Sequence, residues 1–409
     1  YGTVYKAYLP SEPFEVAVKV IDMPKTIHDP CTLGDIFSEV TIMDEMRCEP
    51  RVCHLVDYGV SSGSYYIATS WYRMSLKAWR SAQPPDSLQA NMRVYLSIAT
   101  KLIDAVCRLD DRRVVHFDLK CDNVLLLPLS PHTTSEEMLR QPPGAVAPNF
   151  DVFLADFGES MVYATGEDGY TTRNRGTEYI KSPEMLTVAN ASSKERSTYD
   201  RRKKVGANKA TDVWALGCLI YELLTGEFLF FDDDWIRFFI RVTSDSMGDD
   251  IMAPERLAPL RAVEGGEHVV EFLLWVFVRD PVRRPTIQDV AKRWDVVRML
   301  VANGAPDSEA PEDAAACVSA PDLAASMVMR DSDRAGIAML AREDFSATES
   351  EEARCGWNAV HLSDRLLVGA EPNAVRQVDG REVDSLRRAG VTSVVDCSRL
   401  GGGVVASEK

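Results

Sequence analysis

Three early stretches of the chain alternate apolar and polar residues with a period of two: VYKAYL (4–9), FEVAVKVI (14–21) and YYIATSWY (65–72). This period predicts strands that bury one face, and a stretch with helical spacing at 33–47 interrupts them. Further along, apolar residues recur at helical spacing over 89–109 and in several stretches of 211–300. The pattern predicts an α+β fold, in which a small sheet with one helix is followed by a helical lobe.

The composition changes after residue 300. Residues 301–355 are rich in Ala, Pro and Ser and contain 12 acidic residues against 4 Arg. Such a stretch has too little apolar surface to offset its ordering entropy, so we predict a flexible acidic linker. Strand and helix patterns return within 356–409, in RLLVGA, VDSLRRAG and VTSVVDCS. They predict the first part of another α/β domain.

Length, charge and cysteine content limit the class of protein. The chain has 409 residues, is 45% hydrophobic and carries a net charge of -16, which disfavours nucleic acid and anionic membranes as main partners. The longest apolar run, FLLWVFV at 272–278, is too short to span a bilayer. Nine scattered cysteines without paired zinc spacings predict free thiols in a reducing, cytoplasmic compartment. A basic stretch at 201–204 leaves a nuclear location open.

The stretch VVHFDLKCDNVLLL (114–127) places three polar side chains among apolar residues. Asp118 is suited to orient or accept a hydroxyl proton, and Lys120 to neutralise charge on a transferred phosphoryl group. Asn123 is suited to bind a metal ion through its amide oxygen, and Asp156 in VFLADFGES offers a second oxygen ligand for Mg²⁺. Together these residues predict a site for in-line phosphoryl transfer.

Residues near the N-terminus fit the same chemistry. Lys19 lies in the strand pattern VAVKV, and Glu39 lies in the helical stretch that follows. A lysine held by a glutamate grips two phosphates in a fixed geometry, although either residue alone is more often a surface charge. Gly2 precedes the first strand pattern, where a glycine lets the backbone approach phosphate groups closely; a lone glycine is usually a turn.

These motifs, in this order, resemble those of eukaryotic protein kinases over residues 1–300. The resemblance implies a bilobal kinase fold, ATP and Mg²⁺ as cofactors, and Ser or Thr hydroxyls of protein substrates as acceptors. The family has a strand and further glycines before the position of Gly2, so we expect this sequence to be cut from a longer chain. The implied catalytic residues are Asp118, Lys120, Asn123 and Thr177, the nucleotide-binding residues are Gly2, Val4, Ala17, Lys19, Glu39 and the gatekeeper Thr69, and the metal ligands are Asn123 and Asp156.

Further positions match landmarks of the helical lobe. The motif GTEYIKSPE (176–184) resembles the end of an activation loop, and Asp212 lies in DVWALG. The family pattern implies a buried ion pair between Glu184 and Arg284. Lys120 and Thr177 match the serine/threonine group, whereas Ile180 departs from the usual Tyr.

Phe117 is the main departure from the family pattern, because an Arg that binds an activation-loop phosphate usually stands there. We hypothesise that phosphorylation of this loop is not the main switch. The acceptors Thr165, Tyr170, Thr171 and Thr172 are nevertheless present, and Arg173 or Arg175 are substitute phosphate partners. The alternative is that Phe117 is simply a packing residue.

Two insertions, at 128–150 and 189–209, are predicted to be surface loops. The stretch from VHLSDRLLVGA to VTSVVDCSRL resembles the first elements of dual-specificity phosphatases, whose catalytic Cys and Arg would lie beyond Lys409. Cys397 lies on a strand and is not expected to be the nucleophile; a generic βαβ fragment is about as good an interpretation.

Three hypotheses result: an active serine/threonine kinase, a pseudokinase scaffold that binds nucleotide or partners without turnover, and a kinase–phosphatase fusion. The sequence favours the first, because the lysine, glutamate, aspartates and asparagine of the family site are all present.

Overall fold

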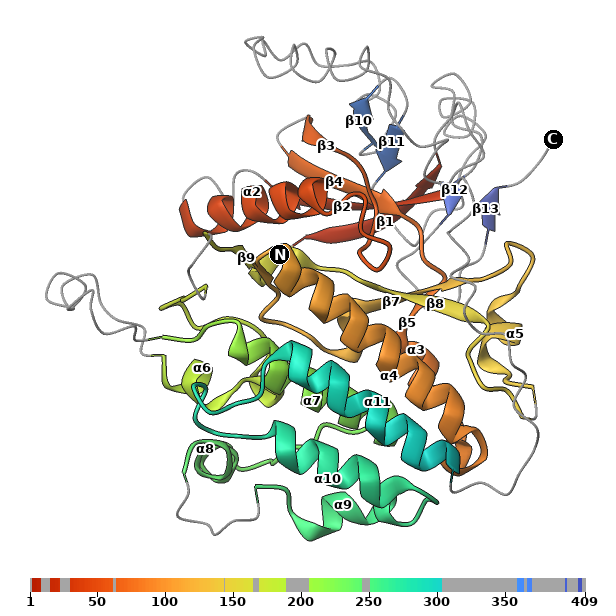
Figure 1. Cartoon of the computed structure of the whole chain (residues 1–409). Helices are drawn as coiled ribbons and strands as arrows, with labels where there is room; N and C mark the ends of the chain where they lie inside the picture. The colour runs from red at the N-terminus through yellow and green to blue at the C-terminus, as the bar shows by residue number, and fades with distance from the viewer. Residues whose placement is uncertain are drawn as a thin grey trace, which may run out of the picture. The chain divides into compact units, whose positions relative to one another are not determined.

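In the computed structural model, the structure describes residues 2–8, 15–22, 30–61, 64–142, 144–164, 169–188, 206–244 and 251–303, and four short strands within 359–406 (Figure 1). The chain divides into two compact units. The sheet unit draws on residues 1–34, 54–71 and 313–409, and the helical unit on 35–53 and 72–312. The mixed helix and sheet content confirms the predicted α+β class.

The sheet unit contains a four-stranded antiparallel sheet in the order β1-β2-β4-β3. Its strands are β1 (Thr3–Tyr8), β2 (Glu15–Asp22), β3 (Leu55–Ser61) and β4 (Ser64–Ser70). Val18 pairs with Tyr5 on one side and Ala68 on the other, so the three side chains share a face. On that face lies an apolar cluster that includes Val16, Val18 and Tyr66.

Two more antiparallel pairs belong to the sheet unit: β10 (Ala359–Ser363) with β11 (Leu366–Gly369), and β12 (Val394–Val395) with β13 (Val404–Ala406). The predicted strand patterns RLLVGA and VTSVVDCS coincide with β11 and β12. The predicted linker, apart from residues 301–303, and the predicted helix VDSLRRAG lie outside the described residues.

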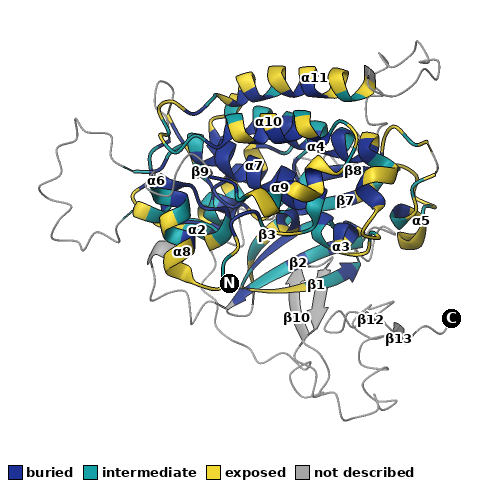
Figure 2. Cartoon of the chain, turned by 90° about the horizontal axis from the view of Figure 1, so that it is seen from below, coloured by how far each residue is buried: buried dark blue, intermediate teal, exposed yellow. Residues whose placement is uncertain are grey.

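The helical unit is built around α7 (Ala210–Thr225), in which residues 211–224 are all buried. Long helices α4 (Ser87–Asp111) and α11 (Ile287–Asn303) lie side by side, and α11 leaves its outer side exposed (Figure 2). The rings of Trp214, Phe230 and Phe277 meet with centroids 5.0–5.4 Å apart. The other helices are α2 (Pro30–Glu45), α3 (Leu76–Ser81), α5 (Ser135–Leu139), α6 (Pro183–Thr187), α8 (Trp235–Thr243), α9 (Pro254–Arg261) and α10 (Gly266–Val276).

Short strands support the loops of the helical unit. A three-stranded sheet has the order β5-β7-β8, formed by β5 (Met74–Ser75), β7 (Val124–Pro128) and β8 (Phe150–Leu154). Strand β6 (Val114–Val115) pairs with β9 (Met161–Val162). These two pairings hold both ends of the segment that contains Asp118.

The insertion between β7 and β8 is not the plain surface loop that the sequence predicted. It contains α5, which begins with a capping box formed by Thr134 and Glu137. Met138 is fully buried, and its carbonyl oxygen accepts a hydrogen bond of 3.0 Å from the indole of Trp79. The second insertion lies outside the described residues from 189 to 205.

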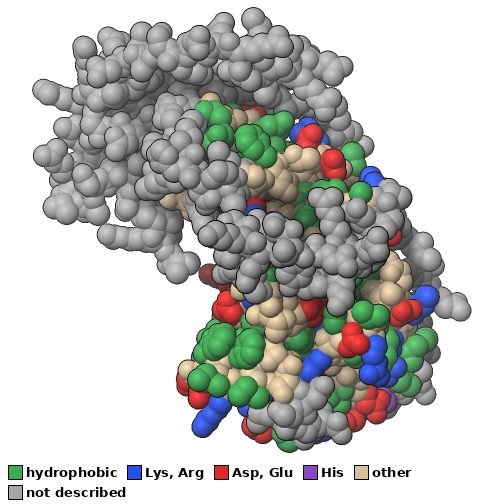
Figure 3. All heavy atoms as spheres, turned by 90° about the vertical axis from the view of Figure 1, so that its left-hand side faces the viewer, with side chains coloured by type: hydrophobic (Ala, Val, Ile, Leu, Met, Phe, Trp, Pro, Cys, Tyr) green, Lys and Arg blue, Asp and Glu red, His purple; other side chains and the backbone are tan. Residues whose placement is uncertain are grey.

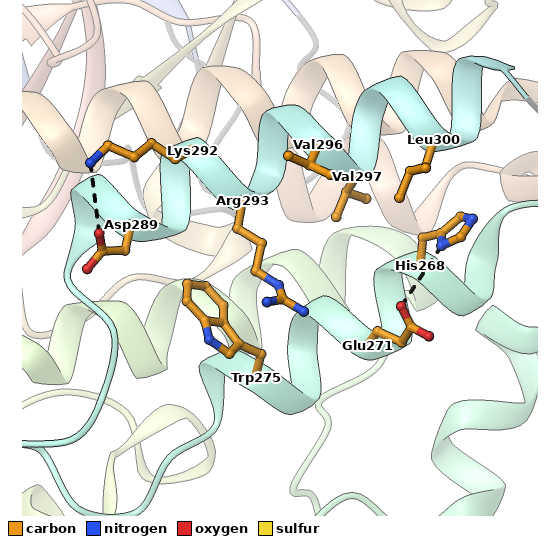
Figure 4. Close-up of a pocket in the computed structure, with 9 residues that line it drawn as sticks. All are labelled: His268, Glu271, Trp275, Asp289, Lys292, Arg293, Val296, Val297 and Leu300. Atoms are coloured by element: carbon orange, nitrogen blue, oxygen red, sulfur yellow. Dashed lines mark ion pairs between the residues drawn. The ribbon is translucent and has the colours of Figure 1, made fainter.

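Part of the surface of the helical unit is apolar. On the side that Figure 3 shows, hydrophobic side chains reach solvent, and α8 exposes Trp235, Ile236 and Ile240. A groove between α10 and α11 is lined by Trp275, whose ring lies 4.8 Å from the guanidinium of Arg293 (Figure 4). Among the described residues, no helix is both long and apolar enough to cross a membrane. Cys48, Cys53, Cys107, Cys121 and Cys218 are free thiols, as predicted.

Candidate active site

Asp212, near the start of α7, holds the loop that precedes Asp118. Its two carboxylate oxygens accept hydrogen bonds from the backbone N–H groups of His116 (2.7 Å) and Phe117 (2.8 Å). Burial raises the pKa of Asp212 to about 7, against the opposing effect of the two N–H donors. The loop turns at Phe117, whose φ of 64° lies in the left-handed region. Strain of this kind persists only where the surroundings over-determine it.

A second buried carboxylate, Glu222, fixes the other side of the loop. It accepts hydrogen bonds from the backbone N–H of Cys121 (3.1 Å) and from the ammonium of Lys77 (2.5 Å). The sequence analysis did not single it out. The available signal was that Glu222 is one of only two acidic residues in the apolar helix DVWALGCLIYELL, the other being Asp212.

Asp118, Lys120 and Thr177 form one hydrogen-bonded group. The Lys120 ammonium lies 2.8 Å from Oδ2 of Asp118 and 2.7 Å from the Thr177 hydroxyl. The backbone N–H of Thr177 donates to Oδ1 of Asp118 at 2.8 Å, across 59 residues of sequence. Asn123 donates its amide to Oδ2 of Asp118 at 2.9 Å. The four residues that the sequence assigned to catalysis thus lie together.

The protonation of this group follows from its contacts. Burial would raise the pKa of Asp118, but the hydrogen bonds from Lys120 and Thr177 outweigh it and lower the pKa. Burial lowers the pKa of His116, whose Nδ1 accepts the backbone N–H of Asp118 at 3.3 Å. At neutral pH the site therefore contains an ionised Asp118 beside a neutral His116.

The two predicted metal ligands lie at the same end of a hairpin. Strands β7 and β8 pair Val124 with Leu154, and the N–H of Ala155 continues the ladder to the carbonyl of Asn123 at 3.0 Å. Asp156 follows at once, with a φ of 63° and an exposed side chain. Because the Asn123 amide nitrogen is used by Asp118, its amide oxygen is left as the metal-binding atom.

This pair of oxygen donors fits Mg²⁺. Among the described residues, no group of three or more His, Cys, Asp or Glu side chains forms a closed metal site. Mg²⁺ typically takes one or two carboxylate or amide ligands from the protein, and completes its shell with water and substrate phosphates. Asn123 and Asp156 match that mode, in which the metal binds together with the nucleotide.

The nucleotide-binding residues predicted on the sheet share one face of it. Lys19 lies opposite Val4, and Ala17 lies opposite Thr69. Directly opposed residues of antiparallel strands point to the same side, as do residues two apart on one strand. Val4, Ala17, Lys19 and Thr69 therefore line the face opposite the apolar cluster. Gly2 lies against this sheet, and a Cβ there would come within 2.7 Å of the Val20 carbonyl oxygen.

The ion pair implied by the sequence is present in the helical unit. Both guanidinium nitrogens of Arg284 contact the carboxylate of Glu184, at 2.7 and 2.9 Å, and the Arg284 side chain is fully buried. Ile180, which departs from the family pattern, is 1% exposed in the core. Its neighbour Tyr179 packs among Phe228, Phe231 and Phe238.

The comparison with known families decides what these residues have in common. The family model described as "Protein kinase domain" matches residues 1–294. The chain belongs to the protein kinase family. The match covers the sheet, the catalytic residues and nearly all of the helical unit, as the sequence predicted.

Individual relatives of this kinase domain are serine/threonine kinases by name. A probable serine/threonine-protein kinase of Dictyostelium discoideum is 50% identical over 302 residues, which are 74% of this chain. Mouse hormonally up-regulated neu tumor-associated kinase is 28% identical over 68% of the chain, and serine/threonine-protein kinase 36 of Pongo abelii is 24% identical over 71%. The matched part covers only 12%, 33% and 18% of these three relatives, respectively.

Proposed function

We propose that this protein is an active serine/threonine kinase that transfers the γ-phosphoryl group of ATP to hydroxyl groups of protein substrates. The observation that carries the proposal is the hydrogen-bonded group of Asp118, Lys120 and Thr177. It combines a carboxylate that orients a hydroxyl with a cation that neutralises the transferred group. Phosphoryl transfer needs little more from side chains than this positioning and charge.

In the proposed reaction, the acceptor hydroxyl oxygen bonds to the γ-phosphorus, and the bond from that phosphorus to the β,γ-bridging oxygen breaks. ADP leaves, and Asp118 takes the hydroxyl proton. The lowered pKa of Asp118 makes it a weak base, so its main contribution is to orient the hydroxyl. Lys120, held by Thr177, offsets the negative charge of the phosphoryl group.

We assign nucleotide binding to the sheet face that carries Lys19, Ala17 and Thr69, with Val4 and Gly2 near the phosphates. Lys19, held by Glu39, would bind the α and β phosphates. Asn123 and Asp156 would hold Mg²⁺, which supplies charge neutralisation between the phosphates. These roles rest on the family pattern, together with the shared sheet face and the hairpin end described above.

The test measures Mg²⁺-dependent transfer of labelled phosphate from ATP to Ser, Thr and Tyr peptides. Asp118→Asn is expected to lower kcat by about 10³-fold, the usual scale for a positioned proton acceptor. Asp122→Asn is the matched control, because it makes the same change on an exposed side chain of the same loop, and it should retain the rate within about twofold. Equal rates for Asp118→Asn and the unchanged protein would refute the proposed mechanism.

A second candidate is a pseudokinase scaffold, and the observation that favours it is Phe117 in place of a basic residue. Its signature would be a melting temperature that rises with Mg²⁺ and ATP, while no phosphate is transferred. A cytoplasmic location stays a proposal that rests on the acidic composition and free cysteines.

The fusion of a kinase with a phosphatase-like domain at 356–409 is likewise a proposal. Its support is the sequence resemblance, with strands β11 and β12 at predicted positions. An H-C-x5-R motif downstream of residue 409 in the parent gene is the expected result of sequencing, and an extended reading frame without that motif would remove the proposal.

A further inference from the structure

Two arginines of the segment before Thr177 converge on one carboxylate of α2. The guanidinium of Arg173 binds both oxygens of Asp35, at 2.7 and 2.8 Å. The guanidinium of Arg175 lies 3.6 Å from the same carboxylate. The contact joins residues 138 positions apart in the sequence, and all three belong to the helical unit. Planar, bidentate pairs of this kind are among the strongest charged hydrogen bonds in proteins.

Asp35 shares a helix face with a residue of the proposed nucleotide site. Asp35 and Glu39 are four residues apart on α2, so they lie on one side of the helix. Glu39 is 4% exposed, which shows that this side of the helix is turned inward. Whatever fixes Asp35 therefore also fixes the rotation of α2 and the direction of Glu39.

At its other end, the arginine pair leads directly to the catalytic group. Arg175 is followed by Gly176 and by Thr177, which binds Asp118 and Lys120. The Arg175 side chain is 8% exposed, and it donates to the carbonyl oxygen of Glu159 at 2.9 Å. Its guanidinium lies 6.0 Å from the centre of the Phe117 ring. Phe117 itself packs in a core cluster with Val115 and Met185.

Phe117 thus supplies a floor for Arg175 in place of a positive charge. A basic residue at 117 would stand beside two guanidinium groups, and an anion would then be needed to hold the three together. With Phe117, the carboxylates of Asp35 and Glu159 are the anions that face Arg173 and Arg175. The pKa of Arg175 is lowered, first by burial and then by Arg173, so loss of the facing carboxylate would leave two like charges together.

We propose that Asp35 is a positioning residue: through Arg173 and Arg175 it holds the activation segment (residues 169–177) against α2, and so keeps Thr177 on Asp118 without a phosphate on that segment. The proposal deepens the proposed kinase function and rests on it. It answers the open alternatives for Phe117, because Arg173 and Arg175 are engaged by a carboxylate of the protein itself, which a phosphate would have to displace.

The test compares Asp35→Asn with Asp35→Glu and with a control on the same helix. Asp44→Asn is matched, since Asp44 also pairs with an arginine (Arg47, 2.7 Å) on α2, away from the activation segment. We expect Asp35→Asn to lower kcat about tenfold, which corresponds to about 1.4 kcal/mol. Asp35→Glu keeps the charge and should retain most of the rate, and Asp44→Asn should stay within about twofold.

Two further readouts separate positioning from a loss of overall stability. In a double-mutant cycle, Asp35→Asn and Arg173→Gln should not add, because each removes the same contact. Hydrogen exchange at the amides of Thr171 and Thr177 should speed up in Asp35→Asn and not in Asp44→Asn, whether or not the protein is active. Phosphatase treatment should leave the rate of the unchanged protein within about twofold.

The results that would overturn the proposal differ from those that would overturn the kinase function. An active protein in which Asp35→Asn behaves like Asp44→Asn, or which loses its rate after phosphatase treatment, contradicts the role of Asp35. An inactive unchanged protein contradicts the kinase function alone, and hydrogen exchange then still decides about Asp35. Unchanged exchange in Asp35→Asn would refute the proposal.

Discussion

Gly176 lies where the activation segment meets the catalytic loop, and its lack of a side chain is required there. Its φ is 79°, and a Cβ at this position would come within 2.2 Å of the Phe117 carbonyl oxygen. That atom is backbone, so it cannot turn away. The contact allows the N–H of the next residue, Thr177, to reach Asp118.

We therefore predict that Gly176→Ala destabilises the helical unit by about 3 kcal/mol or more and lowers kcat at least tenfold. Gly144→Ala is the matched control: its φ is also 79°, but nothing lies within 4 Å of the added Cβ. It should cost only the left-handed strain of Ala, about 1–2 kcal/mol, with no loss of rate. Thermal melting and the peptide assay measure both, and equal effects of the two substitutions would show that the close approach to Phe117 is unimportant.

At the scale of elements, the Glu184–Arg284 pair joins α6 to the segment that follows α10. Arg284 also donates to the carbonyl oxygens of Val278 and Ala210, and its guanidinium lies 5.2 Å from the Trp214 ring. The pair thus links three chain segments under α7. A buried pair with all its donors used is strongly destabilised by loss of one partner, because the other charge stays buried.

Arg284→Met is accordingly expected to cost about 3–5 kcal/mol of folding free energy. Arg261→Met breaks an ion pair with Glu267 in which the side chains are 45% and 55% exposed, and it should cost less than about 1 kcal/mol. Urea denaturation of both variants tests the contrast. Similar midpoints would mean that Arg284 contributes by its apolar stem rather than by its charge.

The elements that the sequence predicted are those with a regular period. The strand patterns in residues 4–9, 14–21 and 65–72 became β1, β2 and β4, and the helical patterns became α2, α4, α7, α10 and α11. Strand β3 was not predicted, because a register shift between Leu55 and Asp57 breaks its alternation. Helix α8 was missed, since WIRFFIRVT has exposed apolar residues beside buried ones.

The candidate site divides in the same way. Asp118, Lys120, Asn123 and Asp156 were predictable, because each lies in a short motif whose spacing places it on one loop or one hairpin. Asp35 was not predictable: its partners are 138 and more residues away, and a single acidic residue in a helix is usually a surface charge. Contacts of that range are specified by the packed fold and not by local pattern.

At the scale of the whole molecule, groups with shifted pKa values determine how stability depends on pH. The pKa values of Asp110, Asp118 and Asp151 are lowered, so their contributions are complete above about pH 3.8 and disappear only below it. Two groups act between pH 4 and 7 in opposite directions. Asp212, with its pKa raised to about 7, takes up a proton in the folded state and favours folding as the pH falls.

His116 acts in the other direction. Its folded pKa lies below the unfolded value of about 6.5, so the unfolded state binds the extra proton, and stability is lost as the pH falls below 6.5. Because Asp212 opposes this trend, the difference between variant and unchanged protein isolates His116. Asp118 and Asp156 favour its protonation and Lys120 opposes it, but burial outweighs them.

We predict that the stability of His116→Asn, relative to the unchanged protein, rises by up to about 1.4 kcal/mol for each pH unit between 6.5 and 5. Urea denaturation, followed by the fluorescence of the buried Trp79, Trp214 and Trp294, measures this difference. His268→Asn is the control, since that side chain is 39% exposed, and its difference from the unchanged protein should not vary with pH. A difference for His116→Asn that is flat over the same range would mean that His116 is protonated in the folded protein, and that the neutral hydrogen-bonded imidazole beside Asp118 is wrong.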